Sequence, residues 1–260
     1  MFMTDEVRLH MESGILAITI HRPDRRNALN QAVLTGLRQA FHDAADDPEV
    51  RVVTLTGAGD KVFCAGADLK SSLPESAGGD AFRRSDYREL LLEILHCPKP
   101  TVALARGHVM AGGLGLLLAC DLALACDDIH FSTPEIQVGM FPMMVLALLY
   151  RHVGRKKAAE MLFLGERIAA PDAHALGLVN HVCTRARFDD EAGRLIRLLA
   201  EKSVGILRLG KEAIRQVEDR ALSEDLKYLE DALGRVMACE DSKEGVRAFV
   251  ERRKPQWRDE

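Results

Sequence analysis

Two glycine-rich segments are the part of this sequence best suited to chemistry. FCAGADLK runs from Phe63 to Lys70, and GHVMAGGLGLLLACD runs from Gly107 to Asp121. Neither is a nucleotide loop, because neither ends in Gly-Lys-Ser/Thr and Leu118 stands where the dinucleotide fingerprint has its last glycine. Each segment follows a strand-like stretch and leads into a helix-like one. Free backbone N–H groups at two such turns could converge on an oxygen that becomes negative during a reaction.

One carboxylate is the candidate for proton transfer. Glu135 follows Pro134 within the segment FSTPEIQVGMFP. A glutamate in this position is often only the charge that begins a helix. A carboxylate held beside a reacting carbon can instead take up and return a proton. Residue type alone leaves both interpretations open.

The elements that must position these residues follow an α/β pattern. Short strands alternate with helices over the first two thirds of the chain, whereas the pattern from about Arg187 to Phe249 is helical. The segment from Ser71 to Ser85 is rich in Ser, Gly, Pro and charge, and is predicted to be a mobile loop or lid. Strands are predicted at 7–10, 15–20, 51–55, 101–105 and 121–126, and helices around 33–41, 90–95 and from 112, while Val62 and Phe63 lead into the turn at 64–68.

Composition limits the class of protein. The 260 residues are 47% apolar, and the net charge of -4 argues against general affinity for nucleic acid or anionic membrane. The six cysteines form no CxxC pair and no zinc spacing, so we expect reduced thiols in a cytoplasmic protein and no metal. The start, MFMTDEVRLHMESG, resembles neither a secretory nor a mitochondrial address. The longest apolar stretch, Val109–Cys126, contains Asp121, so no membrane span is expected.

Four motifs resemble those of the crotonase superfamily, the enoyl-CoA hydratase/isomerase family, in order and in spacing. They are HRPDRRNAL (21–29), TGAGDKVFCAGADLK (56–70), the A-G-G-x-G-L-x-L-A-x-D run (111–121) and FSTPEIQVGMFP (131–142), and the tail FVERRKPQW is also similar. The resemblance covers nearly the whole chain. It implies an α/β crotonase-like spiral of ββα units with a C-terminal helical subdomain, divided into a core of residues 1–200 and a helical trimerisation region of residues 201–260. It also implies a homotrimer or a hexamer, and an acyl-CoA substrate whose coenzyme A is part of the substrate rather than a separate cofactor.

The resemblance assigns roles to individual positions. Ala67 and Gly112 would donate the two N–H groups of an oxyanion hole for the thioester oxygen, and Glu135 would be a catalytic acid/base. Met143 and Met144 would line an apolar acyl pocket. The positions that would contact coenzyme A are Arg25, Arg26, Ala65, Asp68, Leu69 and Lys70, with Phe249 and Lys254 as further candidates in the tail.

The sequence departs from the hydratase pattern at one position. The second hydratase glutamate would fall at residue 115, which is glycine, and the aspartate that some relatives place after the Gly-x-x-Pro turn is replaced by Met143. A single glutamate favours isomerisation of a 3,4 double bond to the 2,3 position. Two alternatives stay open: a genuine 2-enoyl-CoA hydratase with a non-standard water ligand, and a catalytically weak acyl-CoA-binding paralogue. RNA binding, known for one crotonase relative, is not expected, because Arg38 is the single Lys or Arg between residues 30 and 47.

Overall fold

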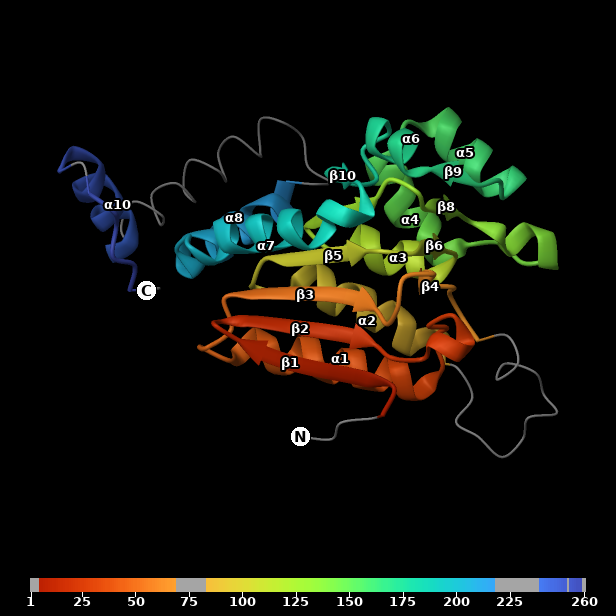
Figure 1. Ribbon diagram of the computed structural model, residues 1–260, viewed down its shortest axis with the longest axis horizontal. Coiled ribbons are helices and arrows are strands. Elements are labelled where there is room, and N and C mark those ends of the chain that lie inside the picture. The colour runs from red at the N-terminus through yellow and green to blue at the C-terminus, as the bar shows by residue number, and fades with distance from the viewer. Residues whose placement is uncertain (1–4, 69–82, 218–238, 252, 259–260) are drawn as a thin grey trace.

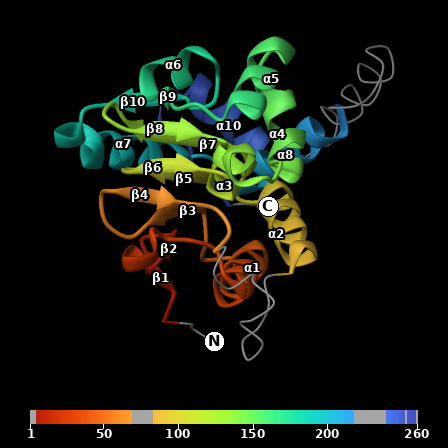
Figure 2. The ribbon, with the colours of Figure 1, turned by 90° about the vertical axis from the view of Figure 1, so that its right-hand side faces the viewer.

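Two β-sheets form the centre of the molecule, and the chain crosses between them repeatedly (Figures 1 and 2). The computed structural model describes residues 5–68, 83–217, 239–251 and 253–258. Strands and helices alternate through the sheets, which confirms the α/β fold class. The strands are β1 Val7–Glu12, β2 Ile15–Ile20, β3 Val52–Gly57, β4 Val62–Cys64, β5 Thr101–Ala105, β6 His108–Met110, β7 Leu122–Cys126, β8 His130–Ser132, β9 Ile168–Ala169 and β10 His181–Cys183. The helices are η1 Pro23–Arg25, α1 Gln31–Asp46, α2 Arg84–His96, α3 Gly112–Ala119, η2 Pro134–Val138, α4 Met143–His152, α5 Arg155–Leu164, α6 Ala170–Ala175, η3 Arg185–Arg187, α7 Phe188–Ala200, α8 Val204–Val217 and α10 Glu240–Val250.

The larger sheet has six strands in the order β1-β2-β3-β5-β7-β10. β1 and β2 form the expected antiparallel hairpin, in which Val7 pairs with Ile20. All other neighbouring strands in this sheet are parallel. β3 is buried along nearly its whole length, as expected for a central strand of a parallel sheet.

The smaller sheet has four strands in the order β4-β6-β8-β9. β4 follows β3, β6 follows β5 and β8 follows β7, so each repeat of the chain adds one strand to each sheet before a helical segment begins. β4, β6 and β8 are parallel, and β9 closes the sheet in the antiparallel direction. This alternation confirms the predicted spiral of ββα units.

The second strand of two repeats has no signal in the sequence. β6 and β8 are three residues long, which is shorter than the runs from which a period of two can be recognised. The boundary of the expected loop at 71–85 is also corrected, because α2 begins at Arg84 and includes Ser85. The rest of that expected loop, up to residue 82, lies outside the described residues.

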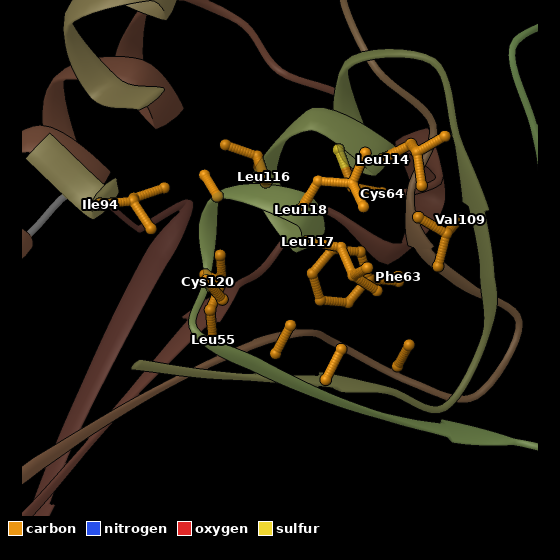
Figure 3. Packing of buried hydrophobic residues seen from close by; sticks show 14 of the residues in the cluster. Leu55, Phe63, Cys64, Ile94, Val109, Leu114, Leu116, Leu117, Leu118 and Cys120 are labelled. Atoms are coloured by element: carbon orange, nitrogen blue, oxygen red, sulfur yellow. The ribbon is translucent and has the colours of Figure 1, made fainter. Parts of the chain in front are cut away.

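Helix α3 is the centre of the core. Its leucines 114, 116, 117 and 118 are almost completely buried. Figure 3 shows Leu117 beside Phe63 from β4 and Leu114 towards Val109 from β6, with Leu116 on the opposite side of the helix. The helix is apolar on all sides, because the sheets and the helices α2 and α4 surround it. The glycine turn at its N-terminus is therefore held by a rigid and fully packed element.

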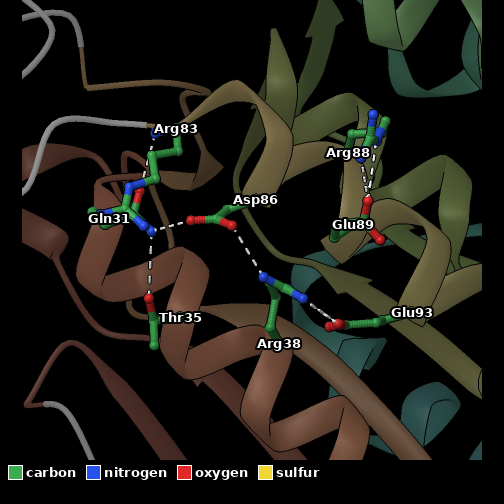
Figure 4. Close-up of polar contacts among 8 residues, drawn as sticks. All are labelled: Gln31, Thr35, Arg38, Arg83, Asp86, Arg88, Glu89 and Glu93. Carbon is green, nitrogen blue, oxygen red and sulfur yellow. Dashed lines mark hydrogen bonds and ion pairs between the residues drawn. The ribbon is translucent and has the colours of Figure 1, made fainter.

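Polar contacts join α1 to the start of α2 (Figure 4). The amide of Gln31 donates to the Asp86 carboxylate at 2.5 Å, and its carbonyl accepts from the backbone N–H of Arg83 at 3.0 Å. Arg38 binds both Asp86, at 3.1 Å, and Glu93, at 2.9 Å. These contacts fix the first turn of α2 against α1. They also pair the single arginine of the 30–47 segment with two carboxylates.

Helix α8 contacts the core through a partly exposed ion pair. The ammonium group of Lys211 binds the carboxylate of Asp121, and it also donates to the carbonyl oxygen of Lys99 at 3.0 Å. The apolar side chains of α8 are only partly covered, and Ile214 is exposed. Among the described helices, none has the length and apolar character that crossing a membrane would require.

Helix α10 lies beyond the ends of α7 and α8, at the far left of Figure 1. The hydroxyl of Ser203 donates to the buried carboxylate of Asp241 at 2.5 Å. The indole N–H of Trp257 donates to the carbonyl oxygen of Glu201 at 2.6 Å. These contacts join the chain end to the α7–α8 junction. The division into a core of residues 1–200 and a trimerisation region of residues 201–260 stays a prediction.

Candidate active site

The two glycine-rich turns meet at the N-terminus of α3. Gly66 has a positive φ of 83°, and a Cβ atom there would lie 2.5 Å from Cβ of Ala111 and 2.8 Å from the backbone nitrogen of Gly112. Contacts below 3.0 Å essentially do not occur for real Cβ atoms. Glycine is therefore required at position 66 both by the backbone conformation and by the close approach of the second turn.

Two backbone donors at this junction are available for a ligand. Ala67 forms an isolated parallel bridge with Leu29, in which the Gly66 carbonyl accepts from Leu29 N–H and the Asp68 N–H donates to the Leu29 carbonyl, both at 2.8 Å. The N–H of Ala67 therefore points away from Leu29. Gly112 is the first residue of α3, so its N–H has no intrahelical acceptor. Within the described residues neither N–H has a hydrogen-bond acceptor.

The residue before Gly112 is strained. Ala111 has φ 50° and ψ -130°, a conformation that residues with a side chain rarely adopt. Its N–H donates to the Ser132 carbonyl at 3.0 Å, which ties the turn to β8. Strain of this kind is typical of sites where a backbone group must point in a fixed direction. The sequence contains no signal for it, because alanine is not a residue type associated with positive φ.

A cavity of about 700 Å³ lies at this junction, between the two turns and the segment from η2 to α4. Six of its lining residues are ones that the sequence singles out: Ala65, Ala67, Gly112, Glu135, Met143 and Met144. Leu29 and Phe141 also line it and stand in two of the quoted motifs, but the sequence assigned them no role, and it missed Arg84, Tyr87 and Val145 altogether. Arg84 and Tyr87 come from α2, which carries no recognised motif. In α2 the sequence shows only a helical pattern of apolar residues, which predicts the helix but not its role in the cavity.

Glu135 lies in η2, on the wall of this cavity. Its Oε2 atom is buried and has no hydrogen-bond partner among the described residues. Burial raises the pKa of Glu135 above its ordinary value, because a low-dielectric environment disfavours the carboxylate. A carboxyl group with these properties titrates at a higher pH than an exposed one, and it can bond to a ligand without first releasing another partner.

No carboxylate stands at position 115, and another side chain occupies the space. A Cβ atom on Gly115 would lie 2.2 Å from the hydroxyl oxygen of Tyr87 and 3.3 Å from Cγ2 of Val145. The hydroxyl of Tyr87 donates to the carbonyl oxygen of Gly112 at 2.7 Å. Glycine at position 115 is therefore required by the packing of Tyr87. It also means that this position supplies no acid.

The positions expected to contact coenzyme A are only partly near the cavity. Arg25 and Arg26 are exposed in and after η1, and the Arg26 carbonyl accepts from the N–H of Ala65 at 3.2 Å. The Asp68 side chain does not line the cavity but binds Arg22 at 3.1 Å.

For the remaining positions expected to contact coenzyme A, the structure gives little or no side-chain information. Leu69 and Lys70 lie outside the described residues. Phe249 lies in α10, with a side chain that is not described, and Lys254 is exposed in the tail. The roles of all these positions stay predictions. Across the described ranges, no group of three or more His, Cys, Asp or Glu side chains could hold a metal ion.

Comparison with known proteins gives matches over nearly the whole chain. The family model described as enoyl-CoA hydratase/isomerase matches residues 10–260. A putative enoyl-CoA hydratase from Thermus thermophilus is 36% identical over 253 residues, which cover 96% of this chain and 100% of that protein. The crystal structure of human enoyl coenzyme A hydratase domain-containing protein 3 superposes with a TM-score of 0.91 at 31% identity, covering 97% of this chain and 100% of that one. An enoyl-CoA hydratase structure from Mycobacterium smegmatis has a TM-score of 0.90 at 33% identity, with 98% and 99% covered.

Proposed function

The chain belongs to the enoyl-CoA hydratase/isomerase family, and from that premise we propose that it isomerises a 3-enoyl-CoA to the 2-enoyl-CoA, with Glu135 as the proton-transferring side chain. The observation that carries the proposal is at position 115. Glycine there supplies no second acid, and the hydroxyl of Tyr87 leaves no room for the side chain of one. A double-bond shift requires one base that returns the proton it takes, whereas hydration requires a water that is both held and deprotonated.

The proposed reaction uses the two free N–H groups and one carboxylate. The N–H groups of Ala67 and Gly112 donate to the thioester carbonyl oxygen, where negative charge develops as the enolate forms. One such donor is worth about 3–4 kcal/mol in a transition state. The Glu135 carboxylate takes a proton from carbon 2, which leaves a dienolate, and the resulting carboxylic acid returns that proton to carbon 4. The double bond moves from 3,4 to 2,3, and no atom is gained or lost.

The environment of Glu135 supports its use in both directions. Burial raises its pKa, so the carboxylate is a stronger base than an exposed one and its acid form is more populated near neutral pH. An acid–base group works best when its pKa lies close to the working pH. The partnerless Oε2 atom in the described structure is available for the proton of carbon 2.

We propose that the acyl group lies against α4 and that coenzyme A lies towards the loop at η1. Met143 and Met144 line the cavity at the start of α4, and the flexible methionine side chain accommodates apolar groups of varied shape. Met143 is 67% exposed, so a chain that covers it would remove apolar surface from water. Coenzyme A would contact Arg25, Arg26 and the segment from Ala65 to Lys70, and it enters as part of the substrate.

Hydration is the second candidate, and the names of the relatives favour it. The matched Thermus thermophilus and Mycobacterium smegmatis proteins are described as enoyl-CoA hydratases. A hydratase with Gly115 would hold its water through a group other than a second glutamate. Hydration adds the water oxygen to carbon 3 of a 2-enoyl-CoA and a proton to carbon 2, so the product is 18 mass units heavier, whereas isomerisation leaves the mass unchanged.

The two reactions are separated by giving the purified protein each substrate alone. A 3-enoyl-CoA should yield a 2-enoyl-CoA of the same mass with increased ultraviolet absorbance from the conjugated thioester, and Glu135→Gln should slow this by about 10²–10⁴-fold. Efficient hydration of a 2-enoyl-CoA, with no turnover of a 3-enoyl-CoA, contradicts the proposal and favours the second candidate. Binding with no turnover of either substrate identifies an acyl-CoA-binding paralogue.

The location proposed for the protein is the cytoplasm. All six cysteines lie in the described part of the chain and are free thiols, as is usual where glutathione keeps thiols reduced. Fractionation of cells that express the full chain tests this, and recovery from an organelle or an extracellular fraction contradicts it.

A further inference from the structure

Tyr87 connects the helix α2 to the donor turn of the cavity. Its side chain is 3% exposed, and it lines the cavity together with Gly112 and Glu135. Its hydroxyl donates at 2.7 Å to the carbonyl oxygen of Gly112, the residue whose N–H is one of the two free donors. The phenol therefore bonds to the residue whose N–H is one of the two proposed donors.

The same hydroxyl occupies the space into which a side chain at position 115 would project. The Cβ of any residue other than glycine at 115 would lie 2.2 Å from the hydroxyl oxygen and 3.4 Å from Cζ of the same ring. The severe conflict is with the oxygen, because 3.4 Å from Cζ is at the edge of ordinary contact and Cγ2 of Val145, at 3.3 Å, would have to move by only a few tenths of an ångström. One atom of Tyr87 thus prevents a second acid from standing beside Glu135.

The contacts of α2 keep this oxygen in place. Asp86, the residue before Tyr87, binds Gln31 at 2.5 Å and Arg38 at 3.1 Å, and Arg83 N–H donates to Gln31 at 3.0 Å (Figure 4). The first turn of α2 is therefore fixed to α1, and displacing it would break these hydrogen bonds. Burial also raises the pKa of Tyr87 well above its ordinary value, so the group is a neutral donor and not a base.

We propose that Tyr87 determines the reaction specificity of this site: its hydroxyl, bonded to the Gly112 carbonyl, fills the space that a second acid and its water would need, and so favours proton transfer within the acyl group over addition of water. Tyr87 is a positioning and excluding residue, and the proton is carried by Glu135. This inference rests on the proposed function.

The experiment compares the ratio of hydration to isomerisation in four purified proteins: the unmodified chain, Tyr87→Phe, Tyr87→Ala/Gly115→Glu and Tyr150→Phe. Tyr150, at 40% exposed on α4, does not line the cavity and is the matched control, which should keep the unmodified ratio. Tyr87→Phe keeps the ring but removes the hydroxyl that bonds to the Gly112 carbonyl, and a water that replaces the hydroxyl should raise the ratio severalfold. The double variant adds the missing acid in the space that has been opened, and its ratio should rise by about 10²-fold or more.

Two further readouts separate this role from a merely structural one. Hydration by Tyr87→Ala/Gly115→Glu should show a bell-shaped pH profile with a second ionisation that the Tyr87→Phe protein lacks. Thermal unfolding of each variant establishes that it is folded, and Tyr87→Leu/Gly115→Glu replaces the double variant if the alanine form unfolds.

The outcomes for the two proposals differ. If the unmodified chain isomerises a 3-enoyl-CoA, and neither Tyr87→Phe nor a folded double variant gains hydration, the inference about Tyr87 is wrong and the proposed function stands. If the unmodified chain isomerises nothing but these variants gain hydration as described, Tyr87 does exclude water and the isomerase proposal is wrong.

Discussion

Burial of the Glu135 carboxyl group has a cost in stability as well as its proposed use in catalysis. Its raised pKa means that the folded protein holds this proton more tightly than the unfolded chain does. The stabilisation from the bound proton is fully present below the ordinary carboxyl value of 4.5, and it is lost as the pH rises through the folded-state pKa. Above the folded-state pKa the folded protein therefore contains a desolvated charge.

Glu135→Gln should raise the melting temperature at pH 7 while it removes activity. Glutamine is neutral and of similar shape, so it avoids the desolvation cost of the carboxylate. At pH 4 and below, where Glu135 is itself protonated, the difference should disappear. Calorimetry at several pH values checks this, with the exposed Glu166→Gln as a control that should change the melting temperature little. A variant that is less stable than the unmodified protein at pH 7 would show that Glu135 has a stabilising partner.

The contact between Gly66 and the second turn gives a prediction at the level of a single methyl group. Gly66→Ala should destabilise the fold by about 1–3 kcal/mol or more and abolish turnover, because the new Cβ would displace Ala111 and the Gly112 nitrogen. Gly59→Ala is the matched control: its φ is also positive, at 78°, but nothing lies within 4 Å of the added Cβ. Denaturant titration of both variants separates backbone strain from the clash. Equal costs at the two positions would refute the close contact.

Some residues of the candidate site could be predicted from the sequence, and others could not. Ala67, Gly112 and Glu135 stand in continuous motifs, and the structure brings all three to one cavity. Tyr87 reaches the same cavity from a helix without a motif, across a distance along the chain that no local pattern connects. The strained backbone of Ala111 depends on its bond to Ser132, which is again a contact between distant segments.

At the level of elements, the packing of α2 against α3 depends on glycine at the contact. Gly115→Ala should destabilise the protein by about 1–3 kcal/mol, because its Cβ overlaps the Tyr87 hydroxyl. In the Tyr87→Phe background the same Cβ would meet Cζ at 3.4 Å, so the substitution should cost much less. Replacing a helical glycine by alanine then contributes up to about 1 kcal/mol of stability. A double-mutant cycle by denaturant unfolding should give a coupling energy of at least about 1 kcal/mol. Additive effects would show that the two positions do not touch.

The helices and strands show which elements the periodic pattern of apolar residues can predict. The strand at Thr101–Ala105 is predicted with its observed bounds, and the helix predicted around 33–41 is the centre of α1. β6 and β8 have too few residues for any period to be visible, yet they build the second sheet on which the spiral depends. They form because parallel pairing of β6 with β4, and of β8 with β6, satisfies their backbone groups, and that pairing is a long-range property.

For the molecule as a whole, the C-terminal helices indicate assembly. α8 is amphipathic, but in a single chain its only fully buried residue is Gly205, and Ile214 is exposed. We predict a trimer or a hexamer in solution, in which these apolar faces are covered.

Light scattering tests the predicted assembly. The protein should have three or six times the mass of the 28.7 kDa chain, and a chain truncated after Ala200 should not assemble. A stable 28.7 kDa monomer at micromolar concentration would contradict the prediction.

The hydrogen bond from Trp257 to Glu201 has a consequence for spectroscopy. Trp257 is the single tryptophan of the chain, and its indole lies against Gly245, where an added Cβ would be 3.2 Å from the ring. Intrinsic tryptophan fluorescence therefore reports on the docking of the C-terminal segment and not on the core. In a urea titration the emission maximum should shift to the red before far-ultraviolet circular dichroism records loss of the sheets, because the hydrogen bonds described for this segment reach the α7–α8 junction and not the sheets. Coincident transitions would mean that the tail and the core unfold as one cooperative unit.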